Sequence, residues 1–163
     1  KTRAYGVGMA GLYINQKGRE SSGIVDPGEE KAALKSELIE KLTGLKDART
    51  GETAVLKVYD TDEIYKGPFR ENGPDMIVGC NAGYRIGWDS VIGNQGAGVF
   101  EDNNKAWRAD HCVDSSLVPG VLFANRPLGS ENPSILDLAP TVLRLFGTEV
   151  PPYMDGKDLD VKL

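Results

Sequence analysis

The chain has 163 residues, of which 40% are hydrophobic and 26% charged, and its formal net charge is −5. This length suits one ordinary domain with a real core, and the composition is typical of globular proteins. Without a basic stripe the chain lacks the electrostatic footprint of a nucleic-acid-binding protein, and no apolar run approaches the roughly twenty residues that a membrane span needs.

The first third of the chain predicts short strands followed by one long helix. Residues 3–15 read as one or two strands interrupted by glycines. Asp26 as N-cap, Pro27 at the first helical position and Glu29 as a capping-box acid predict where the helix begins. Apolar residues then recur at helical spacing as far as Leu45, with Gly44 as the stop signal.

The middle of the chain predicts further strands and a long loop. Residues 53–60 alternate like a half-buried strand, and residues 62–67 indicate a helical turn. Residues 75–80 form an apolar run typical of a buried strand, and residues 83–88 suggest another. Residues 89–116 are rich in Gly, Asn and Asp and predict a long loop, which within a compact domain is often functional.

The end of the chain predicts one more strand and a closing helix. Residues 119–125 indicate a buried strand. The last helix has two candidate starts, Ser134 and Asp137, and Gly147 ends it. Its expected inward face consists of Ile135, Leu138, Ala139, Val142, Leu143 and Phe146. Strands interleaved with helices predict an α/β fold with a mixed central sheet and flanking helices.

The stretch WRADHCVD, residues 107–114, contains the only histidine of the chain, His111. It lies in a polar loop, where Asp110 could orient the imidazole as a hydrogen-bond acceptor behind a metal ligand. Cys112 is a weaker partner, and Asp114 could either ligate or cap the next turn. A catalytic zinc needs about three protein ligands, so one histidine completes no site alone. We therefore predict that His111 is one ligand of a site whose other ligands lie outside this sequence.

Two arginines are weaker candidates for contact with a substrate. Arg19 follows a strand on a glycine turn and could contact an anion, although a charged surface turn explains it equally well. Arg85 has the aromatic neighbours Tyr84 and Trp88 and could line a pocket or pack a strand. The cysteines, Cys80 and Cys112, form no CxxC unit and leave the compartment open, with a slight preference for the cytoplasm.

The C-terminal half resembles the end of alkaline-phosphatase-superfamily proteins, most closely the type I phosphodiesterase/nucleotide pyrophosphatase-like group. The residues that carry this resemblance are DHCVDSSLVPGVLFANRPL and the later PSILDLAPTVLRLFGTEVPPYMDGKDL. The beginning, KTRAY to PGEE, is similar to the segment that follows an Asp-His-Gly metal-binding element in the same group. The likeness covers nearly the whole chain.

This resemblance implies a two-metal phosphoester hydrolase, with zinc or alternatively manganese, acting on a phosphorylated small molecule. His111 matches the last metal ligand of such enzymes. The nucleophile and the other ligands have no counterpart here, so residues 1–163 are expected to be a single domain or the C-terminal segment of a larger catalytic domain. The remainder of that parent chain would be a partner, and the segment alone would be inactive. A phosphomutase or sulfatase-like enzyme, or a non-catalytic binding or assembly domain with a structural histidine, remain alternatives.

Overall fold

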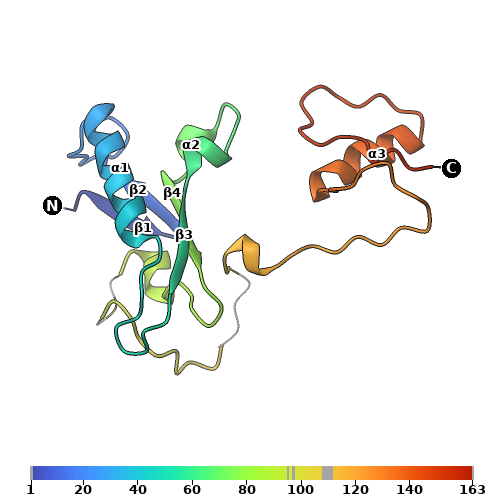
Figure 1. The fold of residues 1–163 in the computed structure, drawn as a ribbon. Helices are drawn as coiled ribbons and strands as arrows, with labels where there is room; N and C mark the ends of the chain where they lie inside the picture. Colours follow the sequence, from blue (N-terminus) through green and yellow to red (C-terminus); the bar gives the residue numbers. More distant parts are fainter. Residues whose placement is uncertain (1, 95, 97, 108–111, 163) are drawn as a thin grey trace. The chain divides into compact units, whose positions relative to one another are not determined.

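The structure is a computed structural model that describes residues 2–94, 96, 98–107 and 112–162 (Figure 1). It divides the chain into two compact units, Lys1–Pro119 and Gly120–Leu163. Among the described residues, no helix combines the length and the hydrophobicity needed to cross a membrane.

The first unit is built on a four-stranded sheet in the order β1-β2-β4-β3, and every neighbouring pair is antiparallel. The strands are β1 (Ala4–Val7), β2 (Gly11–Ile14), β3 (Val55–Asp60) and β4 (Met76–Cys80). The expectation of an α/β fold is confirmed, but the expected mixed sheet is wrong for these strands. The helical connection does carry the chain from β2 to β3 in the same direction. However, β4 lies between them and is antiparallel to both, so no parallel pair forms.

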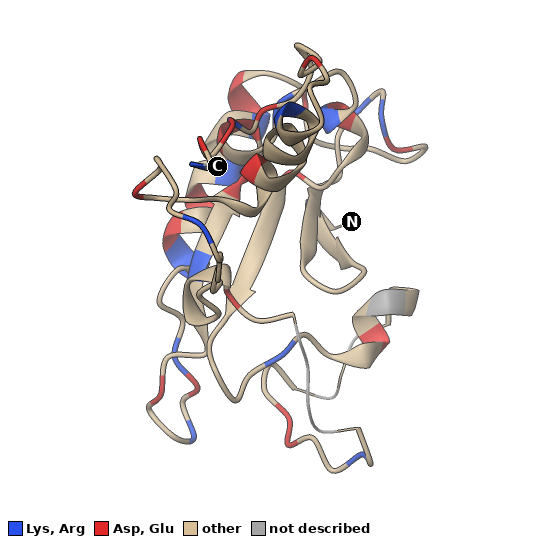
Figure 2. Cartoon of the chain, turned by 90° about the vertical axis from the view of Figure 1, so that its right-hand side faces the viewer, with Lys and Arg blue, Asp and Glu red and all other residues tan. Residues whose placement is uncertain are grey.

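Helix α1 (Glu29–Leu42) packs on the sheet and closes the core of this unit. The buried core residues come from the sheet, from α1 and from the segment between them: Ile14, Val25, Leu34, Val55, Val58 and Met76. Acidic and basic residues are interspersed along the outer side of α1 (Figure 2). The predicted helix was therefore correct in position, and Leu34 lies on the buried face as expected. The expected face was wrong at three positions: Ala32 and Ala33 are exposed, and Lys35, expected on the solvated face, is buried and pairs with Asp60 and Asp62.

The ends of α1 differ in detail from the prediction. The N-cap is Gly28, at φ 92°, and no side chain caps the helix. Glu30, not Glu29, reaches back to accept a hydrogen bond from the backbone N–H of Asp26 at 2.7 Å. The C-terminal signal was correct, because Gly44 follows the last turn at φ 76°, where a glycine is favoured.

Two further predicted strands do not form. Residues 83–88 are turn and loop, and Trp88 begins the short 3₁₀ helix η2 (Trp88–Ile92). Residues 119–125 are extended coil without strand pairing, and the side chains of Val121 and Phe123 are 83% and 91% exposed. Apolar β-prone residues do not make a strand without a neighbouring edge to pair with. The remaining short elements are α2 (Thr61–Ile64), η1 (Arg70–Asn72) and η3 (Ser115–Leu117).

The second unit contains η4 (Ile135–Asp137) and α3 (Leu138–Leu145). Both predicted starts are used: Ser134 forms a capping box with Asp137, and α3 follows directly. The helix ends before Gly147, as predicted. Pro140, Thr141 and Leu159 are the buried residues of this unit.

The face of α3 that the sequence assigned to the interior is largely exposed, which corrects that prediction. The exposed fractions are 82% for Ile135, 50% for Val142 and 83% for Phe146. The 44 residues of this unit supply too few layers to cover a helix on their own.

Candidate functional site

The residues that carry the sequence hypothesis, Asp110 and His111, lie outside the described residues. The residues directly after them are described, and they attach to the sheet at one particular place. The backbone N–H of Asp114 donates a hydrogen bond to the carbonyl of Cys80, the last residue of β4, at 2.8 Å. The described chain therefore resumes after His111 at the carboxyl end of β4.

Asp114 is the anchor of this attachment and is only 3% exposed. Its carboxylate accepts hydrogen bonds from the Tyr59 hydroxyl at 2.9 Å and from both the backbone and the hydroxyl of Ser116, at 2.9 and 2.6 Å. It packs against the backbone at Gly79, where a Cβ atom would lie 2.0 Å from Oδ2. The carboxylate thus caps the turn of η3, which was one of the two roles considered for it.

Burial of Asp114 opposes its ionisation, but the hydrogen bonds from Ser116 and Tyr59 outweigh that effect and lower the pKa of the carboxyl. The same hydrogen bond to Asp114, together with burial, raises the pKa of Tyr59. The pair is therefore held as a carboxylate and a neutral phenol. A charged acceptor at this position fixes the segment more firmly than a neutral one would.

Cys112 gives the segment a second attachment. Its Sγ lies 3.8 Å from the Sδ of Met9, in the turn that joins β1 to β2. That turn is at the same end of the sheet as Cys80, since the N–H of Val78 donates to the carbonyl of Ala10 at 2.9 Å. Residues 112–114 thus contact the end of β4 and the turn between β1 and β2.

Arg19 is half-buried and belongs to an ion-pair network within the first unit. Its guanidinium donates to both carboxylate oxygens of Asp75, at 2.7 and 3.2 Å, and to the carbonyl of Ile14 at 2.7 Å. Its Nε contacts Glu20 at 2.8 Å. Asp75 also receives Lys31 at 2.7 Å and the N–H of Ile14 at 2.6 Å. This network ties the end of β2 to the start of β4.

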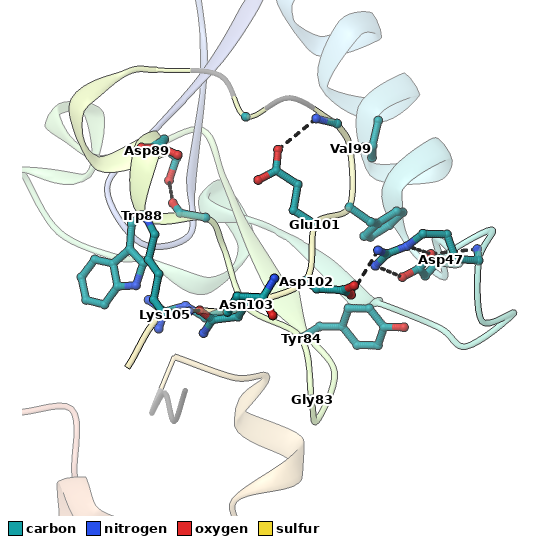
Figure 3. Close-up of a pocket in the computed structure, with 18 of the residues that line it drawn as sticks. Asp47, Gly83, Tyr84, Trp88, Asp89, Val99, Glu101, Asp102, Asn103 and Lys105 are labelled. Atoms are coloured by element: carbon teal, nitrogen blue, oxygen red, sulfur yellow. Dashed lines mark hydrogen bonds and ion pairs between the residues drawn. The ribbon is translucent and has the colours of Figure 1, made fainter. Parts of the chain in front are cut away.

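Arg85 lines a cavity, one of the two alternatives considered for it. Its guanidinium carbon lies 4.3 Å from the centroid of the Trp88 ring, and its Nε donates to the carbonyl of Ile86 at 3.3 Å. The cavity has a volume of about 490 Å³ and lies between residues 47–52 and residues 83–105 (Figure 3). Arg19 is bound beside the start of β4 and Arg85 follows its end, so the structure does not bring the two arginines together.

One wall of the cavity is an ion-pair cluster that the sequence analysis missed. Arg49 donates to the buried carboxylate of Asp47 at 2.9 Å and to Asp102 at 3.1 Å. Tyr84 and Phe100 meet edge to face, with ring centroids 6.2 Å apart. The Asp47-x-Arg49 spacing looks like an ordinary charged turn, and nothing in the sequence links Arg49 to a residue 53 positions away. No local sequence pattern predicted this wall of the cavity.

In the part of the chain that the structure describes, no group of three His, Cys, Asp or Glu side chains is placed to hold a metal ion. Comparison of the chain with protein-family models, with curated proteins and with solved structures finds no significant match.

Proposed function

We propose that this chain is the C-terminal portion of a metal-dependent phosphoester hydrolase of the alkaline phosphatase superfamily, in which His111 donates a neutral imidazole to one metal ion. The resemblance of residues 110–128 and 133–159 is the basis of this proposal. The observation that carries it furthest is the anchoring of residues 112–114 at the carboxyl end of β4. That anchor fixes the residues next to His111 on a regular strand of the first unit, as a segment that carries a metal ligand requires.

The anchor suits a metal ligand because it would restrain the residue next to it. Asp114 is fixed by Tyr59, Ser116 and the backbone of Cys80, and Cys112 contacts Met9. A ligand held by such contacts loses little conformational freedom when a metal binds. The strands supply this rigidity, while His111 itself would supply the donor atom.

The second unit supports a larger parent fold. Three large apolar side chains on one side of η4 and α3, those of Ile135, Val142 and Phe146, are at least half exposed. Exposed apolar patches of this kind mark surfaces that another protein segment covers. We propose the remainder of the parent chain as that cover, since the missing nucleophile and metal ligands would lie there.

Two bound cations, zinc or manganese, would stabilise the attacking and leaving oxygens of phosphoryl transfer. In that arrangement this chain would bind one cation and orient its ligand. His111 would hold the cation, Asp110 would accept a hydrogen bond from the other imidazole N–H, and Asp114 would keep the segment in place. The substrate would be a phosphorylated small molecule. The same features also suit a phosphomutase or a sulfatase-like enzyme.

The single histidine makes a direct test possible, because every imidazole NMR signal of the chain belongs to His111. We expect Zn²⁺ added to the 163-residue chain to shift these signals at high metal concentration, and to shift them at much lower concentration in the longer parent protein. In the parent, His111→Ala should reduce metal content and lower hydrolysis of bis-p-nitrophenyl phosphate by about 100-fold or more.

The matched control is Asn132→Ala, at an exposed position in the second unit between the two stretches that carry the resemblance. This variant should keep both metal and activity. Full metal content and turnover in His111→Ala would sink the proposal in favour of a non-catalytic domain with a structural histidine.

A further inference from the structure

We propose that the cavity between residues 47–52 and 83–105 binds an uncharged, hydroxyl-rich ligand of the sugar class, with Trp88 as its stacking surface. This proposal stands on the cavity alone and does not rest on the metal site. The volume of about 490 Å³ lies in the range of small-molecule sites.

The charge of the lining argues against a phosphate ligand. Among the lining residues that the structure describes, five carboxylates face three cations: Asp47, Glu52, Asp89, Glu101 and Asp102 against Arg49, Arg85 and Lys105. Arg49 is already neutralised by Asp47 and Asp102. An excess of negative charge in a partly enclosed site repels an anion. The ligand that suits this cavity therefore has many polar groups but no negative charge.

The aromatic part of the lining argues against a ligand that binds through hydrogen bonds alone. Trp88 remains 45% exposed, while the Arg85 guanidinium lies over its ring at 4.3 Å. The apolar C–H face of a sugar ring can pack against the exposed part of such an indole, in the way that other flat apolar surfaces stack on aromatic rings. The fork of N–H donors on an arginine suits neighbouring oxygen acceptors at the edge of the ring.

Polar side chains that form hydrogen bonds with hydroxyl groups lie on several sides. Figure 3 shows Trp88 and Tyr84 at opposite ends of the cavity, with Glu101, Asp102 and Asn103 from the long loop between them. Asn94 and Asn104 also line the cavity. Carboxylates and amides accept and donate to vicinal hydroxyls, whereas an apolar ligand would leave them unsatisfied.

Noncovalent contacts connect the walls of the cavity in the absence of a ligand. The Arg49–Asp102 ion pair, at 3.1 Å, joins the segment 47–52 to the long loop. The hydroxyls of Thr50 and Tyr84 are 3.0 Å apart, which joins the same segment to residue 84. A site whose walls are already connected loses less conformational entropy on binding.

Intrinsic fluorescence tests this proposal, because the chain has two tryptophans and Trp107 is not among the lining residues. In the Trp107→Phe variant, Trp88 is the only tryptophan, and the backbone carbonyl of residue 107 that accepts from Asn103 is retained. We expect glucose, galactose, mannose or N-acetylglucosamine to produce a saturable change in its emission. Inorganic phosphate, AMP and choline should produce none.

Calorimetry of the variants then assigns the contact. Trp88→Ala should weaken sugar binding about tenfold or more, and Trp88→Phe should weaken it less, because stacking contributes on this scale. If Trp88→Ala fails to fold, the sugar affinity of Arg85→Ala is measured instead, and the same weakening is expected. No saturable sugar binding, a preference for phosphate or choline, or unchanged affinity in the folded variants would each overturn the proposal. These sugar-binding results do not depend on the hydrolase proposal and would stand if that proposal were contradicted.

Discussion

At the scale of single residues, three carboxylates organise the first unit. Asp75 forms ion pairs with Arg19 and Lys31 and accepts a hydrogen bond from the N–H of Ile14. Asp114 packs against Gly79 and fixes the segment around it. The buried carboxylate of Asp47 holds Arg49 at the wall of the cavity. Each is a buried carboxylate that accepts several hydrogen bonds, the condition under which buried charges are tolerated.

Replacing Asp75 by Asn is expected to destabilise the first unit by about 3–5 kcal/mol, because it leaves Arg19 and Lys31 without their shared acceptor. Urea unfolding followed by circular dichroism measures this loss. The control is Asp26→Asn, which breaks an exposed pair with Lys17 and should change the midpoint little. Equal effects of the two variants would contradict the structural role of Asp75.

The pH dependence follows from the same residue. The hydrogen bonds from Arg19 and Lys31 overcome the effect of burial and lower the pKa of Asp75 in the folded state. The contribution of ionised Asp75 to the free energy of unfolding is therefore complete above the pKa that the group has in the unfolded chain, near pH 4. It is lost as the pH falls through the lower pKa of the folded state. Stability measured from pH 6 downwards should decline below about pH 4, and Asp75→Asn should flatten that decline. An unchanged acid slope in the variant would assign the effect to other groups.

Gly79 tests the anchor of the candidate metal segment. A methyl group there would lie 2.0 Å from Oδ2 of Asp114, so Gly79→Ala should displace the carboxylate and cost about 1–3 kcal/mol. Gly120→Ala is the matched control, since a Cβ at that position meets nothing within 4 Å. Chemical denaturation of both variants makes the comparison, and the Tyr59 hydroxyl should titrate at lower pH in Gly79→Ala once its bond to Asp114 is weakened.

At the scale of elements, local signals were reliable where the chain makes its own contacts. The β1–β2 hairpin, α1, β3, β4 and α3 all form close to the predicted positions. Capping is the clearest case, since Ser134 and Asp137 satisfy each other's backbone groups within four residues. Strand signals failed at residues 83–88 and 119–125, because pairing depends on an edge that the local sequence does not specify.

Ser134→Ala should therefore act locally. Losing the capping box is expected to cost about 1 kcal/mol and to let the start of η4 fray. Hydrogen exchange at Leu136 and Asp137 should become faster, whereas Ser22→Ala, at an exposed serine outside the helices, should leave both rates unchanged. Unchanged exchange in Ser134→Ala would mean that other contacts fix this turn.

At the scale of the whole molecule, the second unit taken by itself does not cover the apolar side chains of η4 and α3. Ile135 and Phe146 are the extreme cases, at 82% and 83% exposed. We expect the isolated chain to associate at high concentration, and the double change of Ile135→Ser and Phe146→Ser to reduce this association in sedimentation experiments. Phe69→Ser, which removes one exposed aromatic residue from the first unit, should reduce it less.

The sequence alone determined the α/β class, the principal helices and strands, and the presence of a single histidine, His111, among polar residues. These are properties of hydrophobic periodicity, capping residues and composition, all of which act over a few neighbouring residues. Only the tertiary structure decided that β4 lies between β2 and β3, that Arg19 forms an ion pair with Asp75, and that Arg85 lines a cavity with Trp88. Those outcomes depend on contacts between residues far apart in the chain, such as Arg19 with Asp75 and Arg49 with Asp102, and no local pattern specifies such pairs.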